Sequence, residues 1–75
     1  MTQMEVAYHY GAAPGEAAMR ALDNVREVYG VRRIALDEQQ RIVRVEFDAS
    51  RLKEPVVVGL LRRAGLDVTA RIVPA

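Results

Sequence analysis

The sequence contains no cysteine and only one histidine, His9. Without cysteine the chain has no disulfide and no thiolate that could bind a metal or attack a substrate. The histidine has no serine partner, because Ser50 is the only serine and lies in a predicted turn. A pair of catalytic carboxylates would need a cleft, which 75 residues can scarcely enclose. We therefore expect no enzymatic activity and no cofactor.

The chain also lacks an excess of charge of one sign and a long apolar run. It has 11 basic and 10 acidic residues, a net charge of +1, whereas a nucleic-acid binder gathers a basic excess on one face. The longest apolar run, VVVGLL, is far too short to cross a bilayer. No apolar signal segment precedes Arg20, the first basic residue. These features predict a cytoplasmic protein without a nucleic-acid or membrane partner.

The sequence does contain enough apolar residues to form a core. Hydrophobic residues make up 51% of the chain, which is typical of globular proteins and too high for a disordered one. A chain of this length forms one domain, residues 1–75, and buries only about 60% of the surface that its unfolded form exposes. The core must therefore hold the fold alone or with help from a partner subunit.

Two kinds of apolar periodicity divide the chain into six elements. Period-two alternation predicts strands over residues 4–10, in both arms of a hairpin over 31–48, and over 66–73. Helical spacing predicts helices over 14–29 and 53–65, which Pro14 and Pro55 begin and Gly30 and Gly65 end. The order β-α-β-β-α-β predicts an α+β fold of the ferredoxin-like plait type. Its four-stranded antiparallel sheet carries both helices on one face.

The same patterns predict which side chains face the core. In the second helix Gly59 is expected to allow a close approach to the sheet, because glycine otherwise costs about 1 kcal/mol relative to alanine. The apolar stripe of that helix consists of Val56, Val57, Leu60, Leu61 and Ala64. The last strand is predicted to turn Val68, Ala70 and Ile72 inward. The arginines and glutamates of the sheet face without helices are expected to form cross-strand ion pairs. That face is predicted to carry Glu5, Ala7, Arg33, Ala35, Arg44, Glu46, Thr69 and Arg71.

Three stretches of the chain resemble a known family. They are GAAPGEAAM, VREVYGVRRIALD, and RIVRVEFDASRL followed by LLRRAGLDV. In this order and spacing they are similar to the heavy-metal-associated (HMA) domain family, which includes copper chaperones and a mercury-binding periplasmic protein. The likeness covers about residues 4–73 and implies the plait fold. In the family, a Met-x-Cys-x-x-Cys loop holds a soft metal ion between two thiolates.

The positions that match this loop hold no thiolate. Pro14 and Ala17 stand at the two cysteine positions, and Ala12 stands at the usual methionine. The resemblance therefore implies the family's fold without its metal site. The loop equivalent to the family's metal site consists of Gly11, Ala12, Ala13, Pro14, Gly15, Glu16 and Ala17.

Three side chains beside this loop are further candidates for a site. His9 is either a metal ligand, with Glu5, Met1 and Met4 near it in sequence, or a solvated histidine at a strand end. Metal sites use about three or four ligands, so a lone histidine binds weakly. Tyr8 and Tyr10 either pack in the core or line a small pocket beside the loop.

These residues lead to two hypotheses about function. In the first, the protein is a small HMA-like binding or regulatory module that has lost the thiolate site and acts through protein contacts. Its partner would be another protein or, in a weak homodimer, a second copy. The contact would involve the loop, the start of the first helix or the open sheet face. In the alternative, the protein binds or transports a heavy-metal ion through non-cysteine ligands near His9.

Overall fold

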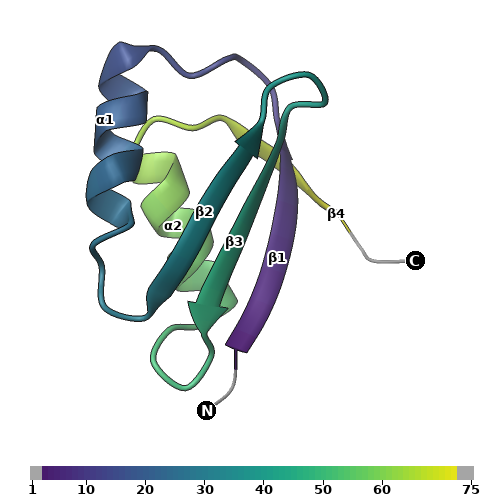
Figure 1. Ribbon diagram of the computed structural model, residues 1–75. Helices are drawn as coiled ribbons and strands as arrows, with labels where there is room; N and C mark the ends of the chain where they lie inside the picture. The colour runs from purple at the N-terminus through teal and green to yellow at the C-terminus, as the bar shows by residue number, and fades with distance from the viewer. Residues whose placement is uncertain (1–2, 73–75) are drawn as a thin grey trace.

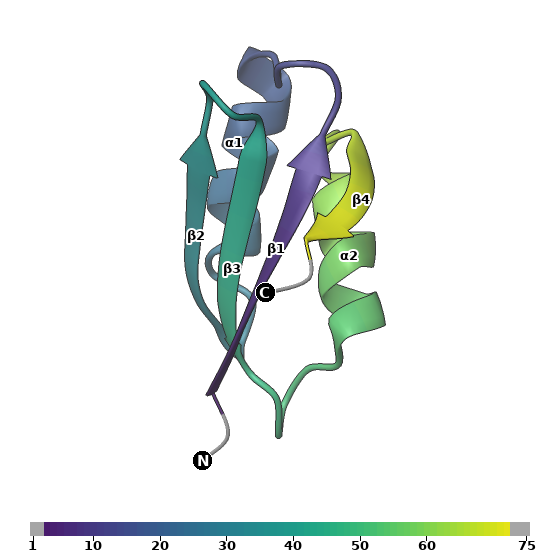
Figure 2. The same cartoon turned by 90° about the vertical axis from the view of Figure 1, so that its right-hand side faces the viewer.

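The structure is a computed structural model that describes residues 3–72. It confirms the predicted plait, a four-stranded antiparallel sheet in the order β2-β3-β1-β4 with both helices on one face (Figures 1 and 2). The last predicted residue of the final strand, Val73, lies outside the described residues. The elements are β1 (Gln3–Tyr10), α1 (Glu16–Val25), β2 (Val31–Asp37), β3 (Ile42–Asp48), α2 (Glu54–Arg63) and β4 (Val68–Ile72).

The core lies between the sheet and the two helices. On the central strands, Val6 pairs with Val45 and Tyr8 pairs with Val43, and all four side chains are buried. Burying each such side chain contributes about 1.5–3 kcal/mol to the free energy of folding. The side chains buried most completely are Phe47, Leu22, Leu61, Val43, Val45 and Val57. No helix among residues 3–72 is long and apolar enough to span a membrane.

Helix α1 is shorter than the predicted range 14–29. It ends at Val25. The next backbone hydrogen bonds join residues three apart, as Glu27 N donates to Asn24 O and Val28 N donates to Val25 O. Gly30 has the left-handed φ of 102° expected of a helix terminator, but it lies beyond this turn rather than at the helix end. As a result Tyr29 leaves the helix and is 71% exposed.

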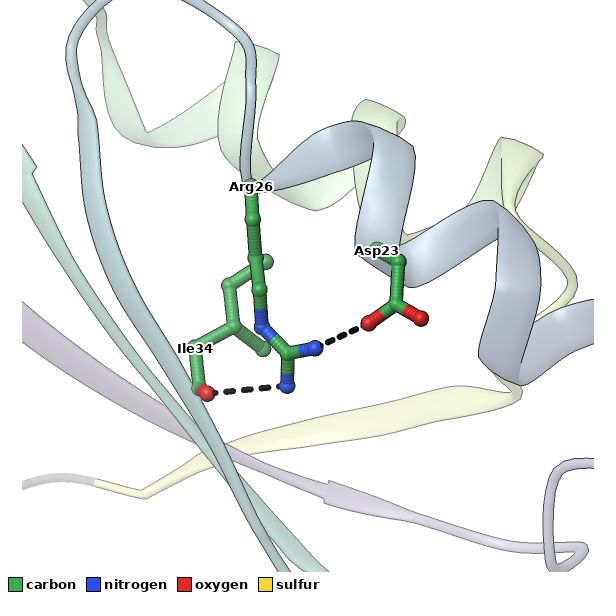
Figure 3. Close-up of polar contacts among 3 residues, drawn as sticks. All are labelled: Asp23, Arg26 and Ile34. Atoms are coloured by element: carbon green, nitrogen blue, oxygen red, sulfur yellow. Dashed lines mark hydrogen bonds and ion pairs between the residues drawn. The ribbon is translucent and has the colours of Figure 1, made fainter.

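Strand β2 forms one edge of the sheet, and an arginine from the end of α1 reaches it. Arg26 Nη2 donates a hydrogen bond of 3.2 Å to the carbonyl oxygen of Ile34, and its Nη1 pairs with Asp23 (Figure 3). The guanidinium thus supplies a donor to an edge carbonyl that has no neighbouring strand.

Helix α2 confirms the predicted helix but corrects its apolar stripe. Val57 and Leu61 are buried as predicted, whereas Val56 is 50% exposed. Val58, which was not in the predicted stripe, packs against the core instead. Adjacent apolar residues leave the phase of a helix ambiguous, and contacts with the sheet decide which of the three valines turns inward.

The expected close approach at Gly59 is also wrong. A Cβ atom built on Gly59 has no atom within 4 Å, so nothing in the fold requires a glycine there. We predict that Gly59→Ala stabilises the protein by about 0.5–1 kcal/mol, because alanine restricts the unfolded chain and favours the helix. Thermal denaturation of both proteins measures this. A lower melting temperature in the variant would contradict the open space seen at this position.

Strand β4 reverses the predicted facing of its second half. Tyr10 pairs with Val68, but His9 pairs with Ala70, so Thr69 is an extra residue that forms a bulge. After the bulge, Arg71 lies opposite Tyr8 on the helix side of the sheet. Ala70 and Ile72 are therefore on the open face and not inward, and Arg71 is not on the open face.

Candidate functional site

The loop that matches the family's metal site is anchored at its first residue. Gly11 N donates to the carbonyl oxygen of Asp67 at 2.9 Å, and the Arg41 guanidinium donates to the carbonyl oxygen of Gly11. A Cβ atom on Gly11 would collide with the Asp67 carboxylate. Arg41 belongs to the β2–β3 turn and has a left-handed φ of 55°. Two distant segments therefore hold the start of the loop in place.

The rest of the loop has few side chains that could bind a ligand or a metal ion. Ala12, Ala13 and Ala17 are exposed and have no polar side-chain atoms, and Pro14 is half-buried. Glu16 pairs with Arg20 at 3.9 Å, but both side chains are almost fully exposed, so the pair contributes little to stability. Gly15 caps α1 without a side-chain hydrogen bond. This surface is a turn with small side chains.

His9 is exposed, on the open face of the sheet near the loop. It pairs with Ile42 and Ala70, neither of which is a metal ligand. Glu5 shares this face, but it lies four positions before His9 in β1, so the two Cα atoms are about 13 Å apart. Met1 lies outside the described residues. Residues 3–72 contain no group of three or more histidine, cysteine, aspartate or glutamate residues arranged to hold a metal ion. The metal-binding alternative thus depends on His9 alone.

Tyr8 and Tyr10 are core residues, each only 3% exposed. The Tyr8 hydroxyl donates a hydrogen bond of 2.8 Å to Glu54 Oε2 at the start of α2. Arg71 Nε lies 2.9 Å from the same oxygen. Burial, and then the hydrogen bond to Glu54, raise the pKa of Tyr8 well above its ordinary value. Burial also raises the pKa of Tyr10. The hollows on the sheet face and at the far end of the molecule are lined by other residues.

The open sheet face carries charges in two neighbouring rows. One row crosses β2, β3 and β1 as Arg33, Glu46 and Glu5. The next row crosses all four strands as Ala35, Arg44, Ala7 and Ile72. Figure 2 looks onto this face, with the helices behind it. A hollow of about 230 Å³ lies between the rows on the β2 side, and one of about 240 Å³ lies on the β4 side.

The expected cross-strand ion pairs are not formed on this face. Within residues 3–72, neither Arg33 nor Arg44 has a carboxylate oxygen within 4.0 Å of its guanidinium. The three ion pairs within residues 3–72 all lie on the helix side of the sheet or on the surface of a helix. The charges of the open face are consequently available to another molecule.

Comparison with known proteins shows the fold. No protein-family model matches the sequence, and no curated protein is recognisably similar to it. The solution structure of apo-CopP from Helicobacter pylori has a TM-score of 0.73 and 24% identity, covering 88% of this chain and 100% of that one. The crystal structure of oxidized MerP from Ralstonia metallidurans CH34 has a TM-score of 0.73 and 16% identity, covering 92% of this chain and 97% of that one.

Proposed function

We propose that the protein is a small HMA-like binding module that lacks a thiolate metal site and acts through protein contacts made by its open sheet face. The resemblance of the sequence to the HMA family and the fold shared with CopP and MerP support the first part. The absence of cysteine and the anchored, chemically bare loop are consistent with the loss of the metal site. The arrangement of charges on the sheet supports the second part.

The observation that carries the proposal is that the open face is complementary to itself. Two copies can pack with their open faces together, related by a two-fold axis that lies between the faces. The axis runs perpendicular to the strands, midway between the two rows. It brings Arg44 of one copy opposite Glu46 of the other, and the reverse. The same rotation places the small Ala35 opposite the long Arg33, and Ala7 opposite Glu5. Charge thus matches between Arg44 and Glu46, and side-chain size matches at the two alanines, as the self-complementarity of a two-fold interface requires. The occupant we assign to this face is therefore a second copy of the chain.

The size of the face predicts a weak dimer. A stable interface buries about 800 Å² on each partner. The whole molecule measures 33 × 30 × 17 Å, and the four strands fill only part of its broad side. Exposed charges at the contact also weaken the gain from burial, since each must lose water. We expect the dissociation constant of the dimer to be micromolar or higher and to rise strongly with salt concentration.

A charge-swap experiment tests this interface. Sedimentation equilibrium of the wild type at rising concentration should show a monomer–dimer equilibrium. Arg44→Glu alone places like charges opposite one another and should weaken dimerisation about tenfold or more. The double variant Arg44→Glu with Glu46→Arg restores opposite charges across the two-fold axis and should recover most of the affinity.

Ala13→Arg serves as the control for the loop. It adds bulk and charge to the exposed loop, away from the sheet face, and should leave dimerisation unchanged. Loss of dimerisation in Ala13→Arg but not in Arg44→Glu would move the contact to the loop. A monomer at all concentrations would overturn the self-association and leave a different protein as the occupant.

A further inference from the structure

A separate pocket lies at the end of the molecule opposite the β1–α1 loop. In Figure 1 the end of α1, the start of β2 and the end of β3 meet at this lower end. The pocket has a volume of about 430 Å³ and is lined by residues from 26–32 and 48–51. It shares no residue with the open-face hollows or with the loop. The module proposed above does not use it.

Hydrogen bonds fix part of the lining of this pocket. Asp48 N donates to the carbonyl oxygen of Gly30 at 2.7 Å, which joins the end of β3 to the turn before β2. Asp48 Oδ1 accepts hydrogen bonds from Ser50 N at 3.0 Å and Ser50 Oγ at 2.6 Å. Arg51 N donates to Asp48 O at 2.9 Å. The backbone at Gly30 and at residues 48–51 is therefore positioned before any ligand arrives.

Two arginines at the pocket have guanidiniums that no ion pair occupies. Arg26 is held by Asp23 and Ile34. By contrast, neither Arg32 nor Arg51 forms an ion pair with a carboxylate of residues 3–72. The two carboxylates in the lining are Glu27 and Asp48. Asp48 is buried, and its Oδ1 accepts two hydrogen bonds from Ser50. These hydrogen bonds, and then the nearby charges of Arg32 and Arg51, lower the pKa of the Asp48 carboxyl, although neither arginine forms a direct ion pair with it. The donors of both guanidiniums can therefore bind an external anion.

An aromatic ring completes the pocket. The Arg51 guanidinium carbon lies 4.5 Å from the centroid of the Tyr29 ring, within cation–π range. This contact favours one orientation of the long arginine side chain, so less entropy is lost when the side chain binds an anion. Tyr29 is nevertheless 71% exposed, which leaves much of the ring free to stack on a flat ligand.

We propose that this pocket binds a small organic anion in which a phosphate or a carboxylate is attached to a flat ring. Arg51 and Arg32 bind the anionic group, and Tyr29 stacks on the ring. Arg32 and Arg51 are the two lining guanidiniums without an ion pair among residues 3–72, so together they can donate hydrogen bonds to one anionic group. A site of this openness gives modest affinity, in about the millimolar range.

An NMR titration of the full chain tests the proposal and separates the two anionic groups. The probes are AMP, benzoate, inorganic phosphate and adenosine, each followed by backbone amide shifts of residues 26–32 and 48–51. Saturable shifts with AMP but not benzoate identify a phosphate ligand, and the reverse identifies a carboxylate ligand. Phosphate alone should bind more weakly than AMP, and adenosine should not bind. Equal binding of phosphate and AMP would overturn the role of Tyr29.

Three variants locate the binding groups. Arg51→Gln and Arg32→Gln should each weaken the best probe about tenfold, and Tyr29→Leu should weaken AMP more than phosphate. Arg20→Gln is the matched control, an exposed arginine of α1 outside the pocket, and should leave affinity unchanged. All four positions are exposed, so melting temperatures should stay close to that of the wild type. Absence of saturable binding by every probe, or an equal loss in the Arg20→Gln control, would overturn the proposal.

Discussion

Gly30→Ala should destabilise the protein by about 2–4 kcal/mol, through backbone strain and a steric clash together. Gly30 has a φ of 102°, a conformation that residues with a Cβ rarely adopt. A Cβ at this position would lie 3.0 Å from Arg51 Cβ and 3.0 Å from Leu52 Cγ. Relief of the clash would push the 48–52 loop away and lengthen the hydrogen bond from Asp48 N to Gly30 O. Chemical denaturation with urea measures the loss.

Gly65→Ala is the matched control because it separates the two causes. Gly65 has nearly the same φ, 101°, but its Cβ would make only an ordinary contact of 3.4 Å with Ala18 Cβ. The Gly65→Ala variant should therefore be destabilised only by backbone strain, about 1–2 kcal/mol. Equal losses for the two variants would show that the 48–52 loop yields without cost and is not held against Gly30.

Glu54→Ala should cost about 2 kcal/mol, because the buried Tyr8 hydroxyl loses its acceptor. The same substitution leaves Arg71 without its ion pair on the helix side of the sheet. Tyr8→Phe removes the hydroxyl but leaves the Glu54–Arg71 pair, so it should cost less, about 1 kcal/mol. The double variant completes a thermodynamic cycle. We expect the two changes to be non-additive, because they share one hydrogen bond of 2.8 Å.

The same contact predicts a loss of stability in alkaline solution. The pKa of Tyr8 is raised above its ordinary value of 10.0 in the folded protein, so the folded state holds the phenolic proton more tightly than the unfolded state. This contribution is fully present below pH 10 and is lost as the pH rises towards the folded-state pKa. Urea denaturation at pH 9 to 11 should show a steeper decline for the wild type than for Tyr8→Phe. Parallel curves would contradict the assignment to Tyr8.

The sequence was sufficient for the order of elements, since apolar periodicity and the positions of Pro55, Gly30 and Gly65 are local signals. It was not sufficient for the second half of β4. One inserted residue, Thr69, changes the side of the sheet on which Arg71 lies, and no residue type in LDVTARIV marks a bulge. The partner of Arg71, Glu54, lies on α2, and their contact exists only after the chain has folded.

Of the two candidate surfaces, the open face could be predicted from the sequence and the pocket could not. Most of the open face follows from alternation, so Glu5, Ala7, Arg33 and Arg44 were predicted correctly from the sequence. The pocket at the far end was missed because residues up to Tyr29 fit a helical pattern. The structure shows instead that the backbone hydrogen bonds after Val25 join residues three apart and not four apart. The helix therefore ends before Tyr29, whose ring contacts Arg51. Anchoring of Gly11 by Arg41 also needs a tertiary contact across 30 residues.

The contact between Arg26 and the edge of β2 affects the size of any assembly. A sheet with an open edge can add further chains strand by strand and grow into a fibril. Arg26 occupies the Ile34 carbonyl, one of the edge groups with which an incoming strand would need to pair. Face-to-face pairing about a two-fold axis closes after two copies, whereas pairing of this edge with the β4 edge of another copy does not close. Arg26 thus favours a finite complex over an endless polymer.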